Sequence, residues 1–154
     1  MHRIPVREIM QTSVITIHPE ELAADAAQLM ADFNIRRLPV VDDDDCVVGI
    51  VTDSDVREAE TAGSVLNSYA PGDKPEWLTV GDIMTADVIT IAPDATIGQL
   101  VTLFIRHKIG GVPVVEADPR YPKRAHLVGI VTETDIFTLI AASWERESAR
   151  NDAA

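Results

Sequence analysis

The stretch GIVTETD at residues 129–135 decides the fold, because nearly the same stretch, GIVTDSD, occurs earlier at residues 49–55. In each copy an apolar run with β-branched residues predicts a buried strand, and the Thr-x-x-Asp at its end predicts the start of a helix. The strand therefore brings a hydroxyl and a carboxylate to one edge of its sheet. The chain is therefore predicted to consist of two copies of one structural unit.

The two Thr-x-x-Asp pairs, Thr52 with Asp55 and Thr132 with Asp135, have two interpretations. As a helix cap, the threonine accepts from a backbone N–H of the first turn and the aspartate bonds back to the cap residue. As a binding site, the junction offers backbone donors and a positive helix end to an anion, and the carboxylate accepts from a ribose diol. Capping is far commoner, so the motif alone favours the cap, although one junction can serve both uses in different ligand states.

A constant offset of 74 residues relates the two copies as far as their second strand. The pattern VxxIM at residues 6–10 and 80–84 predicts a short helical turn, and VITI at 14–17 and 88–91 predicts a β-branched strand that ends before a proline. Apolar residues at three- and four-residue steps then predict a core-facing helix in each copy.

The next strand is predicted at residues 35–41, IRRLPVV, and at 109–115, IGGVPVV, where the proline favours the entry of a strand. The pair Arg36-Arg37 in the first copy is replaced by Gly110-Gly111 in the second. We therefore expect the two copies not to bind a ligand identically. The periodicity by itself indicates an α/β or α+β fold built from a repeated unit.

Composition excludes several classes of function. The chain has 154 residues, 46% of them hydrophobic, and a formal net charge of −12, which opposes binding to nucleic acid or to an anionic membrane surface. The single cysteine, Cys46, excludes an internal disulfide framework and a cysteine-based metal cluster, and it favours a reducing compartment. The sequence shows no signal peptide and no apolar run of membrane-spanning length, so a cytoplasmic location is expected.

Two turns carry further polar residues. The run from Asp42 to Asp45 offers carboxylates to a divalent ion, but contiguous carboxylates on a turn usually stay solvated, so we expect a solvated turn and no metal site. The equivalent turn of the second copy, residues 116–126, is longer and contains two prolines. It is expected to be an exposed loop of variable conformation. The roles of the acidic run and of Trp144 stay open.

The doubled set of Ile-Met, a Leu/Val-Pro-Val-Val strand and Gly-Ile-Val-Thr-x-x-Asp covers residues 6 to about 145 and resembles tandem CBS domains, the Bateman module. The resemblance implies two β-α-β-β-α repeats that form a pseudo-twofold pair, with small sheets flanked by helices. The boundaries that follow are residues 1–60 for the first repeat, 61–79 for a linker, 80–145 for the second repeat and 146–154 for a polar C-terminal tail.

The resemblance implies regulatory ligand binding rather than catalysis. It also implies the ligand, an adenosine-containing molecule such as AMP, ADP, ATP, S-adenosylmethionine or NAD, held in clefts between the copies. In such families the Thr-x-x-Asp carboxylate holds the ribose hydroxyls, which here implies Asp55 and Asp135, with Thr52 and Thr132 beside them. The other implied ligand-binding residues are Thr16 and Thr90 on the first strands, Thr96 at a helix start, Arg36, Arg37, Leu38, Gly110, Gly111 and Val112 at the turns, and His107 and Lys108 for phosphate. For His107 and Lys108, cations that complement a helix C-terminus are an equal alternative.

Enzyme motifs are absent from the sequence, which has no Walker or dinucleotide fingerprint, nucleophile elbow or His-Glu-x-x-His, so no catalytic residue and no catalytic cofactor are expected. The first hypothesis is a stand-alone module that senses an adenosine ligand and signals by conformational change to an unknown effector protein. The second is a ligand-independent oligomerisation or scaffold domain, in which Thr-x-x-Asp is only a cap. An enzyme with its site at a dimer interface is a third. The resemblance also implies a homodimer packed through the helices.

Overall fold

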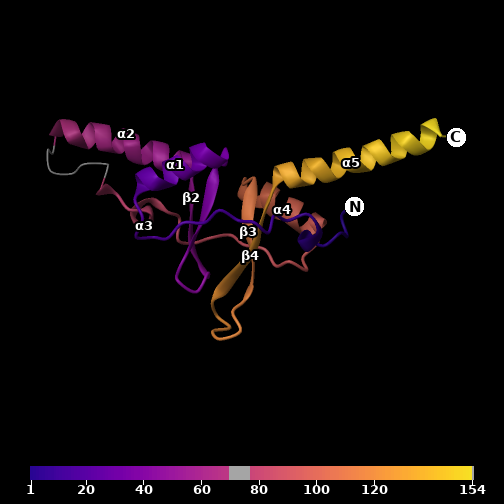
Figure 1. Cartoon of the computed structure of the whole chain (residues 1–154), viewed down its shortest axis with the longest axis horizontal. Coiled ribbons are helices and arrows are strands. Elements are labelled where there is room, and N and C mark those ends of the chain that lie inside the picture. Colours follow the sequence, from indigo (N-terminus) through magenta and orange to yellow (C-terminus); the bar gives the residue numbers. More distant parts are fainter. Residues whose placement is uncertain (70–76, 154) are drawn as a thin grey trace. The chain divides into compact units, whose positions relative to one another are not determined.

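The computed structural model describes residues 1–69 and 77–153 (Figure 1). Residues 70–76, within the expected linker, lie outside the described residues. The elements follow in chain order as η1 (Val6–Glu8), α1 (Ala23–Phe33), β1 (Arg37–Val41), β2 (Val47–Thr52), α2 (Asp53–Tyr69), α3 (Val80–Ile83), α4 (Ile97–His107), β3 (Gly111–Ala117), β4 (Ala125–Thr132) and α5 (Glu133–Asp152). The mixed α/β class predicted from the sequence is confirmed.

The chain folds into two compact units that exchange the opening segments of the sequence repeats. Unit 1 contains residues 1–14, 89–116 and 128–154, and unit 2 contains residues 15–88 and 117–127. The start of the first repeat therefore packs with the body of the second repeat. Likewise, the start of the second repeat packs with the body of the first.

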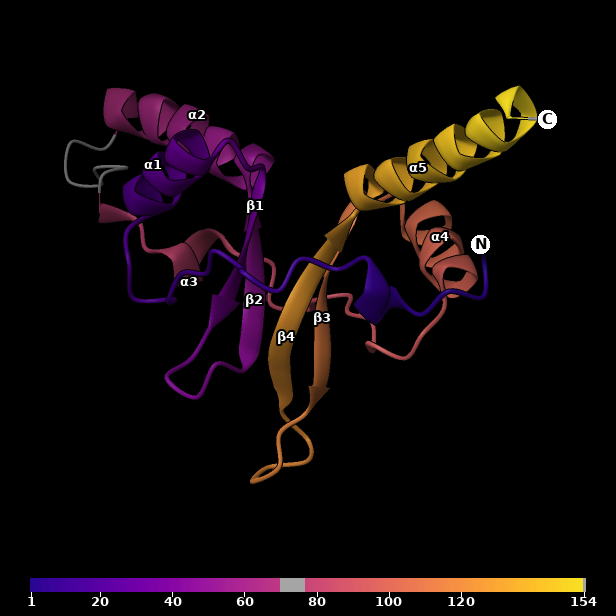
Figure 2. The same ribbon diagram turned by 45° about the vertical axis from the view of Figure 1, so that its right-hand side comes forward.

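Unit 2 is built on the sheet β1–β2, whose strands are antiparallel with Arg37 opposite Thr52. Helices α1 and α2 contact each other, and they contact β1 and β2 respectively (Figure 2). The apolar faces meet in one core, in which each fully buried Val, Leu or Ile side chain contributes about 1.5–3 kcal/mol. That core consists of Ile17, Ala26, Met30, Leu38, Val40, Val51, Val56 and Val80.

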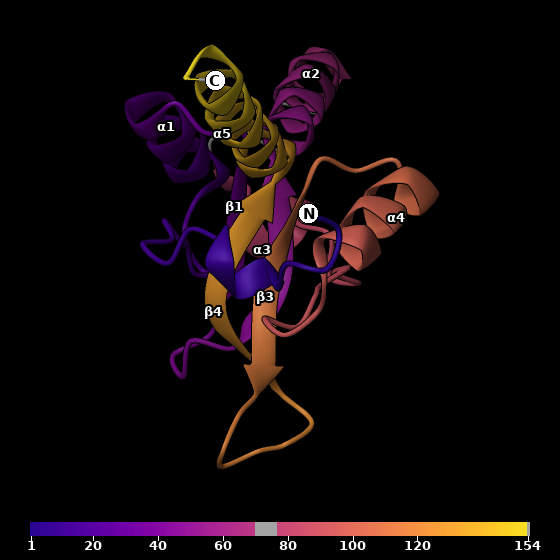
Figure 3. The same cartoon turned by 90° about the vertical axis from the view of Figure 1, so that its right-hand side faces the viewer.

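Unit 1 contains most of the sheet β3–β4, helices α4 and α5, and the N-terminal segment with η1 (Figure 3), whereas residues 117–127 at the tip of the β3–β4 hairpin belong to unit 2. Backbone hydrogen bonds hold that segment in place: the Val6 amide donates to the Ala95 carbonyl at 2.7 Å, and the Ile97 amide donates to the Ile4 carbonyl at 2.9 Å. The core consists of Val6, Ile91, Ile97, Leu100, Phe104, Val112, Val114, Val131 and Ile136.

The strands expected at residues 14–17 and 88–91 are reduced to single parallel bridges, Ile17 with Val40 and Ile91 with Val114. The Ile17 amide donates to the Pro39 carbonyl and the Val41 amide donates to the Ile17 carbonyl. To lengthen this parallel ladder, one more hydrogen bond would have to come from a backbone N–H of Pro39, and proline has none. Because Pro113 takes the same place beside Ile91, the ladder ends at the same point in both copies.

Helix α5 extends farther than the sequence predicted, because the polar segment expected as a tail from residue 146 is helical as far as Asp152. Three large apolar side chains on this helix, Phe137, Ile140 and Trp144, are exposed. Within the described part of the chain, no helix combines the length and the apolar character needed to cross a membrane.

Candidate functional site

Both Thr-x-x-Asp junctions make capping contacts at the start of a helix. At the start of α2 the Thr52 amide donates to Asp55 Oδ2 at 2.8 Å, and the Asp55 amide donates to Thr52 Oγ1 at 3.2 Å. At the start of α5 the Thr132 amide donates to Asp135 Oδ2 at 2.8 Å. The aspartates are half-buried, so each presents a carboxylate at the surface of its unit.

A backbone hydrogen bond joins each junction to the turn that precedes the neighbouring strand. In unit 2 the Asp53 amide donates to the Arg36 carbonyl at 2.9 Å, and in unit 1 the Glu133 amide donates to the Gly110 carbonyl at 2.9 Å. Each unit therefore gathers a hydroxyl, a carboxylate and the turn backbone at one edge of its sheet. The residues brought together in this way are Arg36, Arg37, Thr52 and Asp55 in unit 2, and Gly110, Gly111, Thr132 and Asp135 in unit 1.

The two carboxylates differ in one contact, which the sequence analysis missed. Gln11 Nε2 donates to Asp135 Oδ1 at 2.9 Å, whereas Asp55 Oδ1 has no hydrogen-bond donor among the described residues. Gln11 is fixed by a pair of backbone hydrogen bonds with Ile130 of β4, at 2.8 and 2.9 Å. The signal was present in the repeat, because Gln11 directly follows Ile-Met, where Thr85 stands in the second copy.

Two of the expected ligand residues have no side chain available for a ligand. Leu38 is fully buried and Val112 is 1% exposed, and each side chain belongs to the core of its unit. Leu38 and Val112 therefore stay predicted ligand-binding residues through their backbone groups, not through their side chains.

The remaining expected residues lie at the ends of helices or beside the first strand segments. Thr96 is the N-cap of α4, where its Oγ1 accepts from the Gln99 amide at 3.2 Å. His107 and Lys108 are exposed at the other end of this helix, about 16 Å away along its axis. Thr96 therefore lies at the opposite end of α4 from these two residues. Thr16 and Thr90 are half-buried next to the bridges formed by Ile17 and Ile91.

The expectation of a solvated acidic turn agrees with the exposed Asp43 and Asp45, but it is wrong for Asp42 and Asp44, which pair with arginines. Arg124 pairs with Asp42 and with Asp44, the latter at 3.0 Å, and Arg120 Nη2 lies 3.3 Å from Asp44 Oδ1. Both arginines come from the loop of residues 116–126, which the sequence analysis treated as variable. These partly exposed pairs contribute little energy each, and together they fix the loop against the turn.

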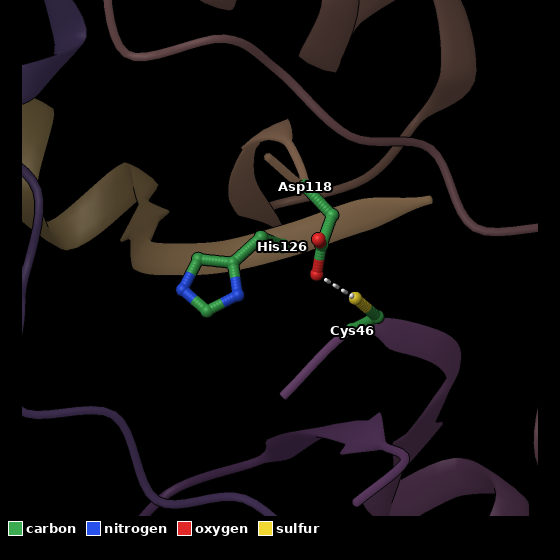
Figure 4. A group of neighbouring side chains, drawn as sticks. All are labelled: Cys46, Asp118 and His126. Carbon is green, nitrogen blue, oxygen red and sulfur yellow. Dashed lines mark hydrogen bonds between the residues drawn. The ribbon is translucent and has the colours of Figure 1, made fainter. Parts of the chain in front are cut away.

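Cys46, Asp118 and His126 form a cluster (Figure 4), and Arg120 Nε lies 3.7 Å from Asp118 Oδ1. Cys46 is 1% exposed and Asp118 is 2% exposed, and Cys46 Sγ lies 3.3 Å from Asp118 Oδ2. The pKa of Asp118 is lowered below its usual value, mainly by the hydrogen bond from the backbone N–H of Arg120, although burial acts in the opposite direction. Burial, followed by the hydrogen bond to Asp118, raises the pKa of the Cys46 thiol. The sequence analysis missed this cluster because its members are 72 and 80 residues from Cys46 along the chain.

Comparison with known proteins gives the family. The model of the CBS domain matches residues 6–61 and 80–142, so the chain belongs to the CBS domain family. The two matches are the two copies of the repeat, and the structure has the fold of a CBS domain pair.

Individual relatives support this assignment. Hypoxic response protein 1 of Mycobacterium tuberculosis is 31% identical over 130 residues, which cover 84% of this chain and 80% of that protein. The CBS domain pair of protein MJ0100, solved in complex with 5′-methylthioadenosine and S-adenosyl-L-methionine, has a TM-score of 0.72 at 31% identity, over 90% of this chain and 97% of that chain. A putative acetoin utilization protein from Vibrio cholerae has a TM-score of 0.76 at 28% identity, over 95% and 96% of the two chains.

Proposed function

We propose that this chain is a non-catalytic regulatory module that binds an adenosine-containing ligand and signals to a partner protein by a conformational change. The observation that carries the proposal is the hydrogen bond from Asp53 to Arg36, and from Glu133 to Gly110, which keeps a surface carboxylate beside the backbone of a turn. The complex of the related MJ0100 pair with two adenosine derivatives supports the choice of ligand class.

In unit 2, Asp55 Oδ1 is the acceptor proposed for the ribose hydroxyls. Oδ2 already accepts from the Thr52 amide, which fixes the carboxylate and leaves Oδ1 for a diol. The backbone of Arg36 to Leu38 is proposed to receive the adenine, because the side chain of Leu38 is buried. Arg36 and Arg37 are proposed to face the phosphates or another anionic group, in a protein whose net charge is −12.

In unit 1 the proposed ligand meets different chemistry at equivalent positions. Asp135 is the ribose acceptor, but its Oδ1 must first release Gln11. Gly110 and Gly111 replace the two arginines, and the cations are His107 and Lys108 at the end of α4. We therefore propose that the two positions differ in affinity, with Asp55 as the more accessible carboxylate.

A homodimer is proposed through α5. Phe137, Ile140 and Trp144 follow each other at steps of three and four residues, so they share one helical face, and they are 62%, 47% and 68% exposed. An exposed apolar stripe of this kind is typical of an interface. The effector protein is proposed to be a separate chain, located with this one in the cytoplasm.

The alternative is a ligand-independent scaffold, which the capping contacts favour because Thr52 and Asp55 make them without any ligand. Thermal unfolding of nucleotide-free protein with AMP, ADP, ATP, NAD and S-adenosylmethionine separates the two. A ligand that binds only the folded state adds about 2.7 kcal/mol at a hundredfold excess over Kd. A higher melting temperature with one compound supports the regulatory module. Unchanged melting with all five supports the scaffold.

A further inference from the structure

The tip of the β3–β4 hairpin and the start of β2 are fixed against each other by backbone contacts within unit 2. Cys46 and His126 form an isolated antiparallel bridge, and the Leu127 amide donates to the Asp45 carbonyl at 3.0 Å. The Asp118 amide donates to the Arg124 carbonyl at 3.0 Å, which closes the loop. The positions of Cys46, Asp118 and His126 are therefore set by the main chain.

These three side chains converge. One potential ligand atom from each, the Cys46 sulfur, an Asp118 oxygen and a His126 ring nitrogen, lies within 4.8 Å of the other two (Figure 4). Two of the three residues are buried and the third is half-buried. We propose that Cys46, Asp118 and His126 form a binding site for a divalent transition metal, with Zn²⁺ as the expected ion.

The carboxylate of Asp118 is already oriented to coordinate a metal ion. Its Oδ1 accepts from the backbone amides of Arg120 at 2.7 Å and Tyr121 at 3.2 Å, which holds the carboxylate in one orientation. Its Oδ2 faces Cys46 Sγ and has no other hydrogen-bond partner in the described chain. The Arg120 guanidinium lies 3.7 Å from Oδ1, on the oxygen that the site does not use. Such contacts behind a ligand orient it toward the metal.

His126 and Cys46 complete the donor set. Among the described residues, none forms a hydrogen bond with the His126 imidazole, so a ring nitrogen is available to a metal. The thiol of Cys46 contacts Asp118 and, at 3.8 Å, the Asp44 carbonyl. When an ion binds, the Cys46 S–H bond breaks, the proton leaves to solvent and a metal–sulfur bond replaces it.

The donor types select the metal. A thiolate, an imidazole and a carboxylate suit Zn²⁺ and related transition metals, whereas Mg²⁺ and Ca²⁺ prefer oxygen ligands alone. Three protein ligands leave a fourth position of a tetrahedral ion for water. The site is separate from the proposed ribose acceptor, because Cys46 precedes β2 and Thr52 ends it, about 20 Å along the strand.

The test uses full-length protein without a histidine tag, freed of metal with a chelator and titrated with Co²⁺ and then Zn²⁺. We expect about one Co²⁺ per chain, with the intense visible bands of a tetrahedral ion and a thiolate charge-transfer band that Zn²⁺ abolishes. Cys46→Ser should lose the charge-transfer band. His126→Gln should weaken Zn²⁺ binding by about tenfold or more.

Two control variants separate this site from general attraction to an acidic protein. His18→Gln removes an imidazole elsewhere in unit 2, and Asp43→Asn removes an exposed carboxylate of the acidic run. Both should bind Zn²⁺ like the unchanged protein. The proposal is overturned if the metal-free protein binds no Co²⁺ stoichiometrically, or if Cys46→Ser and His126→Gln, shown to be folded by circular dichroism, bind Zn²⁺ unchanged.

Discussion

The side-chain amide of Gln11 donates a hydrogen bond to Asp135 Oδ1 at 2.9 Å, and the equivalent oxygen of Asp55 receives no such bond within the described chain. The carboxylate of the second copy is thus occupied by a residue of the N-terminal segment. A ligand that uses Asp135 must displace Gln11, whereas a ligand at Asp55 meets an open oxygen. The two copies of the motif are therefore chemically unequal although their sequences nearly coincide.

Gln11→Ala should raise the affinity for the adenosine ligand at the Asp135 position by about two- to tenfold, the equivalent of one hydrogen bond that no longer competes. Isothermal titration calorimetry measures this change. Gln28→Ala is the matched control, because Gln28 Nε2 makes the same kind of bond, donating to Asp32 Oδ1 at 2.7 Å between exposed side chains of α1. Weaker binding in Gln11→Ala would mean that Gln11 assists the ligand instead.

Gly129→Ala should destabilise the folded protein by about 1–3 kcal/mol, because an added Cβ would lie 2.8 Å from Met10 Sδ and 2.9 Å from the Gln11 carbonyl oxygen. The side chain of Met10 can move, but the backbone carbonyl cannot do so without disturbing the bond between Gln11 and Ile130. Urea unfolding measures the loss. As a control, Gly110→Ala should cost less, because the atoms nearest to its Cβ belong to the flexible end of Glu133. An equal loss in both variants would contradict this packing argument.

The repeat and its helix starts were predictable from sequence because their signals are local. A β-branched run followed by Thr-x-x-Asp indicates a strand and a cap within seven residues, and both appear at β2–α2 and β4–α5. The strands predicted at residues 14–17 and 88–91 are only single bridges, at Ile17 and Ile91. The prolines used to predict the next strand lack the N–H that a longer ladder requires.

Other features depend on contacts between residues far apart in sequence. No local signal tells that residues 116–126 return to the acidic run, so the pairs of Arg120 and Arg124 and the burial of Asp118 were missed. The burial of Leu38 and Val112 depends on which face of a short strand meets the core. The exchange of opening segments between units is likewise set by packing.

Asp82 provides a prediction of pH dependence. The pKa of Asp82 is lowered below its ordinary value of 3.8, mainly by the hydrogen bond from the backbone N–H of Thr79. The ionised carboxylate therefore stabilises the folded state above pH 3.8, and this contribution is lost as the pH falls through the folded-state pKa. The difference in free energy of unfolding between the unchanged protein and Asp82→Asn should shrink over that range. Chemical denaturation at a series of pH values checks this, and a difference independent of pH would contradict it.

The exposed face of α5 predicts the oligomeric state. The double change Phe137→Ser with Trp144→Ser should weaken a homodimer by about tenfold or more, because large aromatic side chains dominate interface energies. Tyr121→Ser, which removes a 54% exposed aromatic side chain from the hairpin loop, should leave the dimer unchanged. Light scattering at micromolar concentration measures the mass. A monomeric unchanged protein would contradict the proposed dimer.

The central claim is that the Asp55 and Asp135 carboxylates hold the ligand. It is tested most directly by calorimetric titration of the ligand identified in the thermal panel. Asp82→Ala controls for the loss of a cap, because Asp82 and Thr79 make the same reciprocal contacts at α3, outside the proposed site. Asp55→Ala and Asp135→Ala should each weaken one binding event by about tenfold or more, since each loses charge-assisted hydrogen bonds. Asp82→Ala should bind normally. Unchanged affinity in the double variant of Asp55 and Asp135 would contradict the claim and leave both residues as helix caps.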